Sequence, residues 1–320
     1  MTLDDSPDQV SADAQAIILI CTSLGLNGRE PNLRPFGPRA WATLSAAMAG
    51  RDLAPGSLPG RTAAALQADL GLDGADGVRL AGLLDRAGQI AFELERLRSR
   101  GIWVLTQADD EYPPRLWELQ RDAPAVLFGA GDLDALDAGG LAVVGSGQAD
   151  PAAIAWAEQL AAAAAGAGAA VISGGAPGID TAVIRSAIAA GGTGLIVLPE
   201  GIERPLRAPA IRSAIEAGQA LVISPYRPDA PFSDAAAIGR NRLIHALADA
   251  AVVVSAQAGT GGTWAGATEN LAASWGVPLF VRDGAGVPPG NRDLLAAGAR
   301  PVGDEEPGPA TIALLLGTPD

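Results

Sequence analysis

The sequence predicts an α/β fold in which a doubly wound, mostly parallel sheet follows an all-helical N-terminal domain. Two observations carry this prediction. From Leu141 onward, short and fully apolar runs alternate with segments of helix length, a pattern typical of a parallel sheet covered on both faces. The first hundred residues read instead as helices separated by proline and glycine.

Three segments of the first hundred residues are expected to be helical. The segment 11–26 opens with a serine suited to capping a helix, and the segment 37–50 ends at Gly50. The segment 76–101 is expected to be one helix, because leucine and isoleucine recur at helical spacing: Leu80, Leu83, Leu84, Ile90 and Leu94. Its basic last turn (Arg96, Arg98, Arg100) suits the helix dipole, with a partner-binding basic face as the alternative. We expect a helical domain over 1–100 and an α/β domain over 101–320.

The second domain begins with two short strands, 102–106 and 125–131, on either side of a helix that starts at Pro113 and Pro114. The later apolar runs are LAVVG (141–145), AAVISGG (169–175), GLIVLPE (194–200), ALVISPY (220–226), AAVVVSA (250–256) and VPLFVRD (277–283). Ligands of open parallel sheets bind outside the carboxyl ends of the strands, so a site is expected in the loops after these runs.

The composition limits the class of protein. With 320 residues, 48% of them hydrophobic, the chain has enough material for one large core or two domains. One cysteine, Cys21, cannot form an intramolecular disulfide, and one histidine leaves no usual Cys/His zinc site. We expect no metal, no cofactor and a cytoplasmic location.

The same composition bears on membranes and nucleic acid. The start of the chain lacks the basic region of a signal peptide, and no apolar run is long enough to span a bilayer, so no membrane association is expected. A net charge of −14 argues against indiscriminate binding to nucleic acid, but a small basic pocket is compatible with it.

Glycine-rich loops follow two neighbouring runs. Gly145, Ser146 and Gly147 precede a helix that starts near Pro151, and their backbone N–H groups can hold a phosphate. Asp150 stands where a dinucleotide-binding G-x-G-x-x-G motif has its third glycine, so a tight strand-to-helix turn is the alternative.

The second loop has the same character. Ser173, Gly174 and Gly175 leave a strand, Asp180 begins a helix, and Arg185 lies one turn further on. Two such turns from neighbouring strands can face one crevice and hold an anion. Asp180 is otherwise explained as a helix-start residue favoured by the dipole.

A third loop, 259–263, follows the run 250–256. Its Gly262 and Thr263 offer flexible backbone and a hydroxyl to a phosphate. Trp264 offers a stacking face for a base, with a place in the core as the alternative.

The trio Arg240, Asn241 and Arg242 stands at the head of a predicted helix. Two arginines together in so acidic a chain indicate an anion, with pairing to acids such as Asp234 or Asp249 as the alternative. His245 follows in the same helical pattern and is expected to be a satisfied helix residue rather than a catalytic one.

No catalytic constellation is present in the sequence. A nucleophile elbow, a P-loop and a distinctive carboxylate pair are all missing. Glu200, Glu203 and Glu269 become candidate acids or bases only if the pocket is catalytic. We therefore expect no catalytic residues and no enzyme.

The order of these motifs resembles the DNA-processing protein A (DprA/Smf) family from Gly101 to Val302. The matching segments include LAVVGSG, VISGGAPGIDTAVIRSAI, VLPEGIERP, LVISPY, IGRNRLIHALADAAVVVSA and GNRDLLAAGARPV. The resemblance implies an extended Rossmann-like fold, a homodimer, and single-stranded DNA bound at the strand ends and passed to a RecA-type recombinase in natural transformation. It implies DNA contacts from the 145–146 turn, the 173–174 turn, Arg185 and the 240–242 trio.

The chain also departs from the family's pattern. Gly147 and Pro177 stand where the family usually has arginine, and Ile184 stands where it usually has histidine. Each lost phosphate contact is expected to lower affinity and reduce the salt dependence by about one unit. The segment 259–270 departs from the usual loop, and the winged-helix tail that many members carry is not expected after residue 320.

The sequence thus supports one leading hypothesis and two others. The leading one is a DprA-like protein that binds single-stranded DNA, protects it and hands it on without covalent chemistry. The alternative is a nucleotide-binding sensor or a phosphoribohydrolase of the lysine-decarboxylase-like Rossmann group, although that group's P-G-G-x-G-T-x-x-E spacing is missing. The third is an interaction protein that binds through its helical domain.

Overall fold

The computed structural model describes residues 10–26 and 32–317. The acidic start of the chain, residues 1–9, on which the signal-peptide expectation depends, lies outside the described residues. The chain forms two compact units. The first runs to Tyr112 and includes Leu119–Phe128, and the second consists of Pro113–Glu118 and the residues from Gly129 onward.

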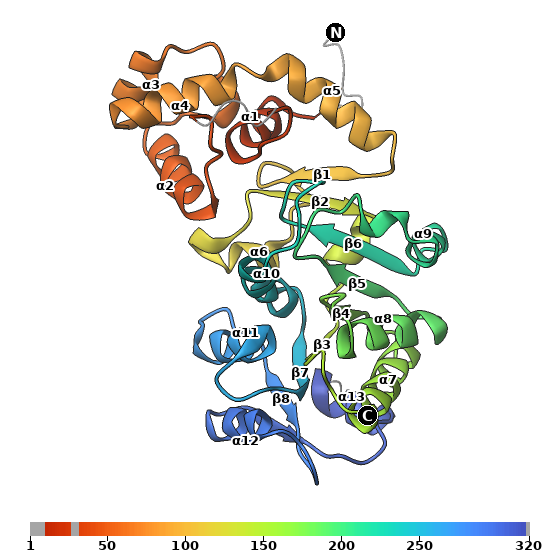
Figure 1. The fold of residues 1–320 in the computed structure, drawn as a ribbon. Helices are drawn as coiled ribbons and strands as arrows, with labels where there is room; N and C mark the ends of the chain where they lie inside the picture. Colours follow the sequence, from red (N-terminus) through yellow and green to blue (C-terminus); the bar gives the residue numbers. More distant parts are fainter. Residues whose placement is uncertain (1–9, 27–31, 318–320) are drawn as a thin grey trace. The chain divides into compact units, whose positions relative to one another are not determined.

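Helices make up most of the first unit, as the predicted fold class requires. They are α1 (Ala12–Cys21), α2 (Pro38–Ala49), η1 (Pro55–Ser57), α3 (Ala63–Leu70), α4 (Gly74–Leu84), α5 (Ala87–Arg98) and η2 (Gln120–Asp122) (Figure 1). Ser11, Thr62 and Asp73 cap α1, α3 and α4, each accepting a backbone N–H three residues on. Such a cap stabilises a helix by about 1 kcal/mol.

The single helix expected over 76–101 is wrong, because the chain breaks between α4 and α5. Arg86 lies at the break and is buried. Its guanidinium donates hydrogen bonds to the carbonyl oxygens of Leu19, Thr22 and Leu24, at the end of α1 and just beyond it. A helix C-terminus leaves carbonyl groups without partners, and here a side chain from a distant segment satisfies them. This contact is invisible in the local periodicity of 76–101.

Strands occupy the predicted apolar runs. β1 (Trp103–Thr106) and β2 (Val126–Ala130) are neighbours and flank α6 (Pro114–Trp117) in the chain. Among the residues described, the second unit holds a parallel sheet whose order is β6 (Ala220–Ser224), β5 (Gly194–Val197), β4 (Val171–Ser173), β3 (Leu141–Gly145), β7 (Ala250–Ser255), β8 (Leu279–Arg282) and β9 (Arg300–Val302). The predicted doubly wound, parallel fold is confirmed.

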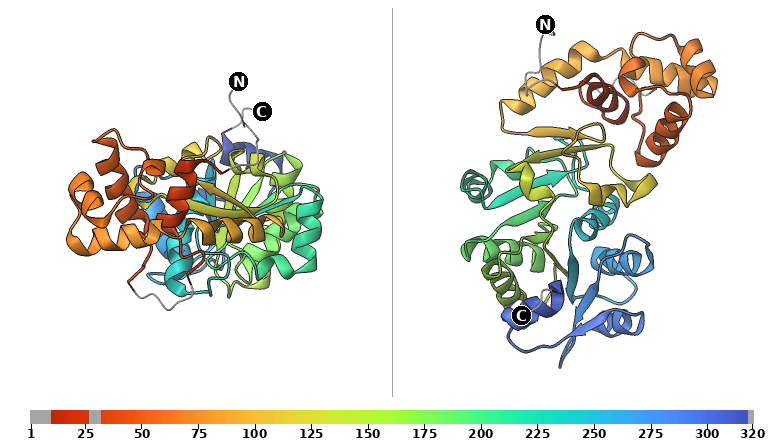
Figure 2. Two further views of the ribbon diagram at one scale, coloured as in Figure 1. Left: turned by 90° about the horizontal axis from the view of Figure 1, so that it is seen from above. Right: turned by 180° about the vertical axis from the view of Figure 1, so that it is seen from behind.

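Two layers of helices cover this sheet. On one side lie α7 (Pro151–Gly166), α8 (Ile179–Ala189) and α9 (Pro209–Glu216); on the other lie α10 (Asp234–Ala246), α11 (Gly261–Ala272) and α12 (Pro289–Ala296) (Figures 1 and 2). The chain moves outward from β3 to β6 and then returns to the opposite side of β3 with β7. Because crossovers are right-handed, the helices change face at this point. The β3–β7 boundary is therefore the topological switch point of the sheet.

Short elements complete the second unit: η3 (Leu133–Leu136), η4 (Pro205–Arg207) and α13 (Pro309–Leu316). The sheet is the core of the unit, since every residue of β3, β6 and β7 is buried. No helix in the described part of the chain combines the length and apolar character needed to cross a bilayer. The described residues contain no His, Cys, Asp or Glu cluster able to hold a metal ion.

The third glycine-rich loop is shorter than predicted. Helix α11 begins at Gly261, so Gly262, Thr263 and Trp264 lie in its first turn rather than in a loop. Close packing against Asn241 explains why positions 262 and 266 are glycine. A Cβ on Gly262 would lie 3.1 Å from Nδ2 of Asn241, and a Cβ on Gly266 would lie 3.0 Å from Cβ of Asn241. The helix starts early because α10 and α11 pack tightly there.

Candidate functional site

The ends of β3 and β4 meet the starts of α8 and α11 and the middle of α10. Gly145 ends β3, and a Cβ on it would lie 2.7 Å from the side chain of Ile179, the first residue of α8. Gly147 and Gly178, on neighbouring loops, also lie close together, because a Cβ on Gly178 would lie 3.0 Å from Cα of Gly147. We name this group the strand-end cluster and define it by its residues: Gly145, Ser146, Gly147, Gly174, Asp180, Arg240, Asn241, Arg242, Gly262 and Thr263.

Gly174 makes room for a buried arginine. A Cβ at this position would lie 2.0 Å from Nη1 of Arg240, so no larger residue fits while the guanidinium occupies this place. Arg240 is only 4% exposed, and its Nη1 donates a hydrogen bond to the carbonyl oxygen of Val197 at the end of β5. The glycine-rich turn after β4 therefore serves first to admit an arginine side chain from α10.

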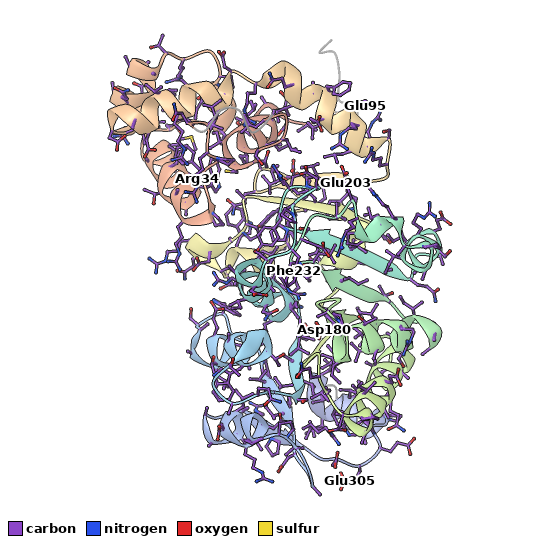
Figure 3. The ribbon with its side chains drawn as sticks, in the orientation of Figure 1. Arg34, Glu95, Asp180, Glu203, Phe232 and Glu305 are labelled. Atoms are coloured by element: carbon purple, nitrogen blue, oxygen red, sulfur yellow. The ribbon has the colours of Figure 1, made fainter. Side chains whose placement is uncertain are left out.

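Asp180 is a buried acid whose negative charge interacts with the positive charge of Arg240. It is 6% exposed, and burial raises the pKa of its carboxyl group, while the positive charge of Arg240 and the backbone N–H groups of Ala176, Gly145 and Gly174 lower it. Burial likewise lowers the pKa of Arg240, and Asp180 raises it. Asp180 Oδ1 and Arg240 Nε each make no hydrogen bond to a described residue. Figure 3 shows Asp180 between the two helical layers of the second unit.

Arg240 was expected to meet an anion together with the rest of the trio, but its side chain is buried. Its guanidinium lies inside the cluster, because Gly174 leaves space and Asp180 supplies an opposite charge there. Tyr226 lies close enough to both arginines of the trio for their charges to lower its pKa, although burial raises it more. Its hydroxyl donates a hydrogen bond to the carbonyl of Ala236 in α10 (3.0 Å). Tyr226 was not among the predicted site residues, although it follows the carboxyl end of β6 by two residues.

Several groups predicted to bind an anion are already engaged within the chain. The N–H of Ser146 donates to the carbonyl of Ser255 (2.8 Å), and its hydroxyl accepts from the N–H of Gln148 (3.2 Å). The Ser173 hydroxyl is buried and donates to the carbonyl of Val143 (2.7 Å). Asp150 caps α7 through the N–H of Ala153 (2.8 Å). These hydrogen bonds hold the turn after β3 tightly between its strand and α7, and Asp150 already supplies an acceptor at the start of that helix.

The other two residues of the trio face α11. Nδ2 of Asn241 donates to the carbonyl of Gly262 (2.7 Å), and Arg242 pairs with Glu269 (3.0 Å). Both arginines thus interact with acids, Arg240 with Asp180 and Arg242 with Glu269, while Asp249 pairs with Arg115. No side chain caps the first turn of α11, which leaves the N–H groups of Gly262 and Thr263 as candidate anion donors.

Arg185 and Gly175 do not join the cluster. Arg185 is exposed on α8 and pairs with Glu158 of α7 (2.7 Å). Both residues line a separate hollow between α8 and α9. Arg185 belongs to α8, whereas the trio belongs to α10 on the opposite face of the sheet (Figure 1).

His245 and the candidate acids show no catalytic arrangement. His245 lies on α10 as predicted, but it is not satisfied, because its Nδ1 is buried without a hydrogen-bond partner. Burial lowers its pKa to about 4, so the ring is neutral at physiological pH. Glu200 pairs with Arg204 (3.1 Å) and Glu269 pairs with Arg242, so each of these acids already has a counter-charge within the chain.

An exposed aromatic residue was also missed. Phe232, labelled in Figure 3, precedes α10 and is 54% exposed. It lines a groove together with Arg204 and Arg207. It begins the segment that carries the trio, yet nothing in the local pattern separates an exposed phenylalanine from a buried one.

Comparison with known proteins places these features in a family context. The sequence model of the family described as DNA recombination-mediator protein A matches residues 103–307, more than half of the chain. Over 222 residues the chain is 34% identical to a DNA processing protein, DprA, of Mycobacterium tuberculosis, a match that takes in 63% of this chain and 56% of that protein. The chain therefore matches little more than half the length of these curated relatives.

Two solved structures are similar to this fold. The crystal structure of DNA processing protein A from Streptococcus pneumoniae has a TM-score of 0.70 at 20% identity, covering 96% of this chain and 98% of that one. DNA processing protein A from Helicobacter pylori, whose single-stranded DNA binding mode has been described, has a TM-score of 0.53 at 25% identity, covering 62% and 90%.

Proposed function

The chain belongs to the DNA recombination-mediator protein A family, and from this premise we propose that it binds single-stranded DNA at the strand-end cluster. The observation that carries the proposal is the convergence of two glycine turns, the arginine trio and the uncapped start of α11 within the matched segment. The described binding of single-stranded DNA by the Helicobacter pylori relative supports the same conclusion.

The residues of the cluster take different parts in this proposal. Arg242 and the N–H groups of Gly262 and Thr263 contact phosphate directly, since they lie toward the surface. Ser146 and Gly147, in the turn after β3, let the DNA backbone approach the protein main chain closely. Arg240, Gly174, Ser173 and Asp180 hold the inner framework of the cluster rather than contacting the strand.

The protein acts, in this proposal, by binding and transfer, with no covalent step. It works in the cytoplasm as a homodimer, protects the bound strand from nucleases and delivers it to a recombinase of the RecA type during DNA uptake or recombination. The burial of His245 and the pairing of the acids Glu200 and Glu269 with arginines support a binding role over a hydrolytic one.

Fluorescence anisotropy with a labelled oligo-dT strand tests the proposal. We expect saturable binding that weakens with salt, because each phosphate contact releases counterions. The variant Arg242→Gln is expected to bind more weakly and to reduce the slope of log K against log salt by about 0.7. Arg240→Ala is a poor test, because it leaves the charge of Asp180 buried without its counter-charge.

Two matched variants control this experiment. Glu269→Gln removes the acid that pairs with Arg242 and is expected to bind the strand at least as tightly as the parent. Arg292→Gln removes an exposed arginine of α12 outside the cluster and is expected to change nothing. Binding that ignores salt, or an Arg242→Gln variant that binds like the parent, would refute the proposal.

A further inference from the structure

A cavity of about 570 Å³ opens between α8 and α9 on one face of the sheet. Aliphatic side chains form its walls: Ile184, Ile188, Ile196, Leu198, Ile211 and Val222. It exists because α9 is short and buries only one residue, Ala214, whose side chain is too small to fill the space above β5 and β6. Cavities of roughly 300–1,000 Å³ with mainly apolar walls are typical of small-ligand sites.

Charged residues border this cavity. Arg185 and Arg204 are 71% and 78% exposed at the side chain and pair with Glu158 and Glu200. The Arg185–Glu158 pair is open to solvent, and such pairs contribute roughly 0–1 kcal/mol, so the Arg185 guanidinium can turn toward an anion at little cost. The carboxylate of Glu200, which is only 14% exposed, offers a hydrogen-bond acceptor at the mouth. The occupant is therefore expected to combine an apolar body, an N–H donor and an anionic group.

A nucleobase with its phosphate meets all three requirements. Its flat ring suits aliphatic walls, its N–H group suits Glu200, and its phosphate suits Arg185 or Arg204. The cavity also adjoins the strand ends, because Gly175, in the turn after β4, lines it. We propose that the cavity between α8 and α9 receives one base of a bound single strand; this inference rests on the proposed function.

Insertion of one base is energetically reasonable. A base in a single strand loses little stacking when it turns outward, since extrusion costs least where no base pair must break. The apolar walls compensate by burying the faces of the ring. A site of this kind favours no particular sequence strongly, because every base has two flat faces.

Base-specific fluorescence tests the inference. A series of oligo-dT strands carries 2-aminopurine at one position at a time, and quenching by acrylamide is measured in the complex. We expect one position, or one per protein subunit, to be protected at least about threefold relative to the others. The variant Ala214→Leu, which fills the cavity, is expected to abolish that protection and to weaken strand binding about threefold to tenfold.

The control variant is Ala217→Leu, which adds the same side chain to the exposed end of α9. It is expected to keep both the protection and the affinity, and both variants are expected to unfold at or above the parent's melting temperature. Equal quenching at every position, with strand binding intact, would overturn the inference and leave the proposed function standing. Displacement of the strand by thymidine monophosphate at submillimolar concentration would assign the cavity to a free nucleotide and would also overturn the inference. If the parent protein bound no strand at all, both the inference and the proposed function would be overturned.

Discussion

Asp180 and Arg240 are both buried, and each stabilises the charged form of the other beside Gly174. Both residues belong to the strand-end cluster. Asp180 lies at the start of α8 and Arg240 lies on α10. Burying a charge is costly unless an opposite charge or hydrogen bonds compensate for it. The pair therefore ties together two helices on opposite faces of the sheet.

Removing one member of this pair is expected to destabilise the protein strongly. Arg240→Met leaves the carboxylate of Asp180 buried without its counter-charge and is expected to lower the free energy of unfolding by about 3–5 kcal/mol. The double variant Asp180→Asn/Arg240→Met is expected to lose less than the two single variants together. Urea unfolding of all four proteins measures the coupling, and simple additivity would show that the two charges do not interact.

Restoring a cation on the turn after β3 is expected to strengthen strand binding. Gly147 is exposed, its φ is not positive, and a Cβ there meets only the carbonyl of Pro177 at 3.1 Å. Gly147→Arg is expected to raise affinity for oligo-dT and to steepen the salt dependence by about 0.7. Gly147→Gln, of similar length without the charge, serves as the control. Equal salt slopes for the two variants would contradict the prediction.

The Arg185–Glu158 pair, which joins α8 to α7 on the face of the sheet opposite the trio, allows a separate test of strand binding. Both side chains reach solvent, so breaking the pair is expected to change stability by less than about 0.5 kcal/mol. Arg185→Gln is expected to weaken strand binding about threefold to tenfold, because one phosphate contact is lost. Glu158→Gln frees the arginine and is expected to bind as tightly as the parent or more tightly. Anisotropy titrations at one fixed salt concentration decide between these outcomes.

His245 is expected to make stability depend on pH. Its pKa is lowered to about 4 in the folded protein, while an unfolded histidine titrates near 6.5. Between these values the unfolded chain binds a proton that the folded chain does not. The contribution is therefore fully present above pH 6.5 and is lost as pH falls toward 4, by at most about 1.4 kcal/mol per pH unit.

The variant His245→Gln isolates this effect, since the chain has no other histidine. Its free energy of unfolding is expected to fall less steeply than the parent's between pH 6.5 and 4. In the parent, the NMR signal of the ring is expected to stay that of a neutral imidazole down to about pH 5. A ring that titrates near 6.5 in the folded state would contradict the prediction.

The sequence predicted the sheet well because its signal is local. The apolar runs at 141–145 and 250–256 coincide with β3 and β7 within one residue, since a strand buried on both faces must be apolar throughout. The glycines after β3 and β4 were likewise recognisable as places of close approach. Helix caps such as Asp150 follow from residues three positions apart and are equally local.

The errors share one cause, which is contact between distant segments. Arg86 breaks a periodic helix because carbonyls at the end of α1 need its donors, and α11 starts early because it packs against Asn241. The site was affected in the same way: Arg240 and Arg185 are both arginines on predicted helices, yet one is 4% exposed and the other reaches solvent.

The sequence by itself therefore determined the fold class, the strands and the set of loops in which a site could lie. Only the tertiary structure decided which cations face solvent, because burial depends on what opposes each side chain in space. Gly174 and Asp180 make the interior acceptable to one arginine, and they lie about sixty residues from it in the chain. No local pattern records a partner at that distance.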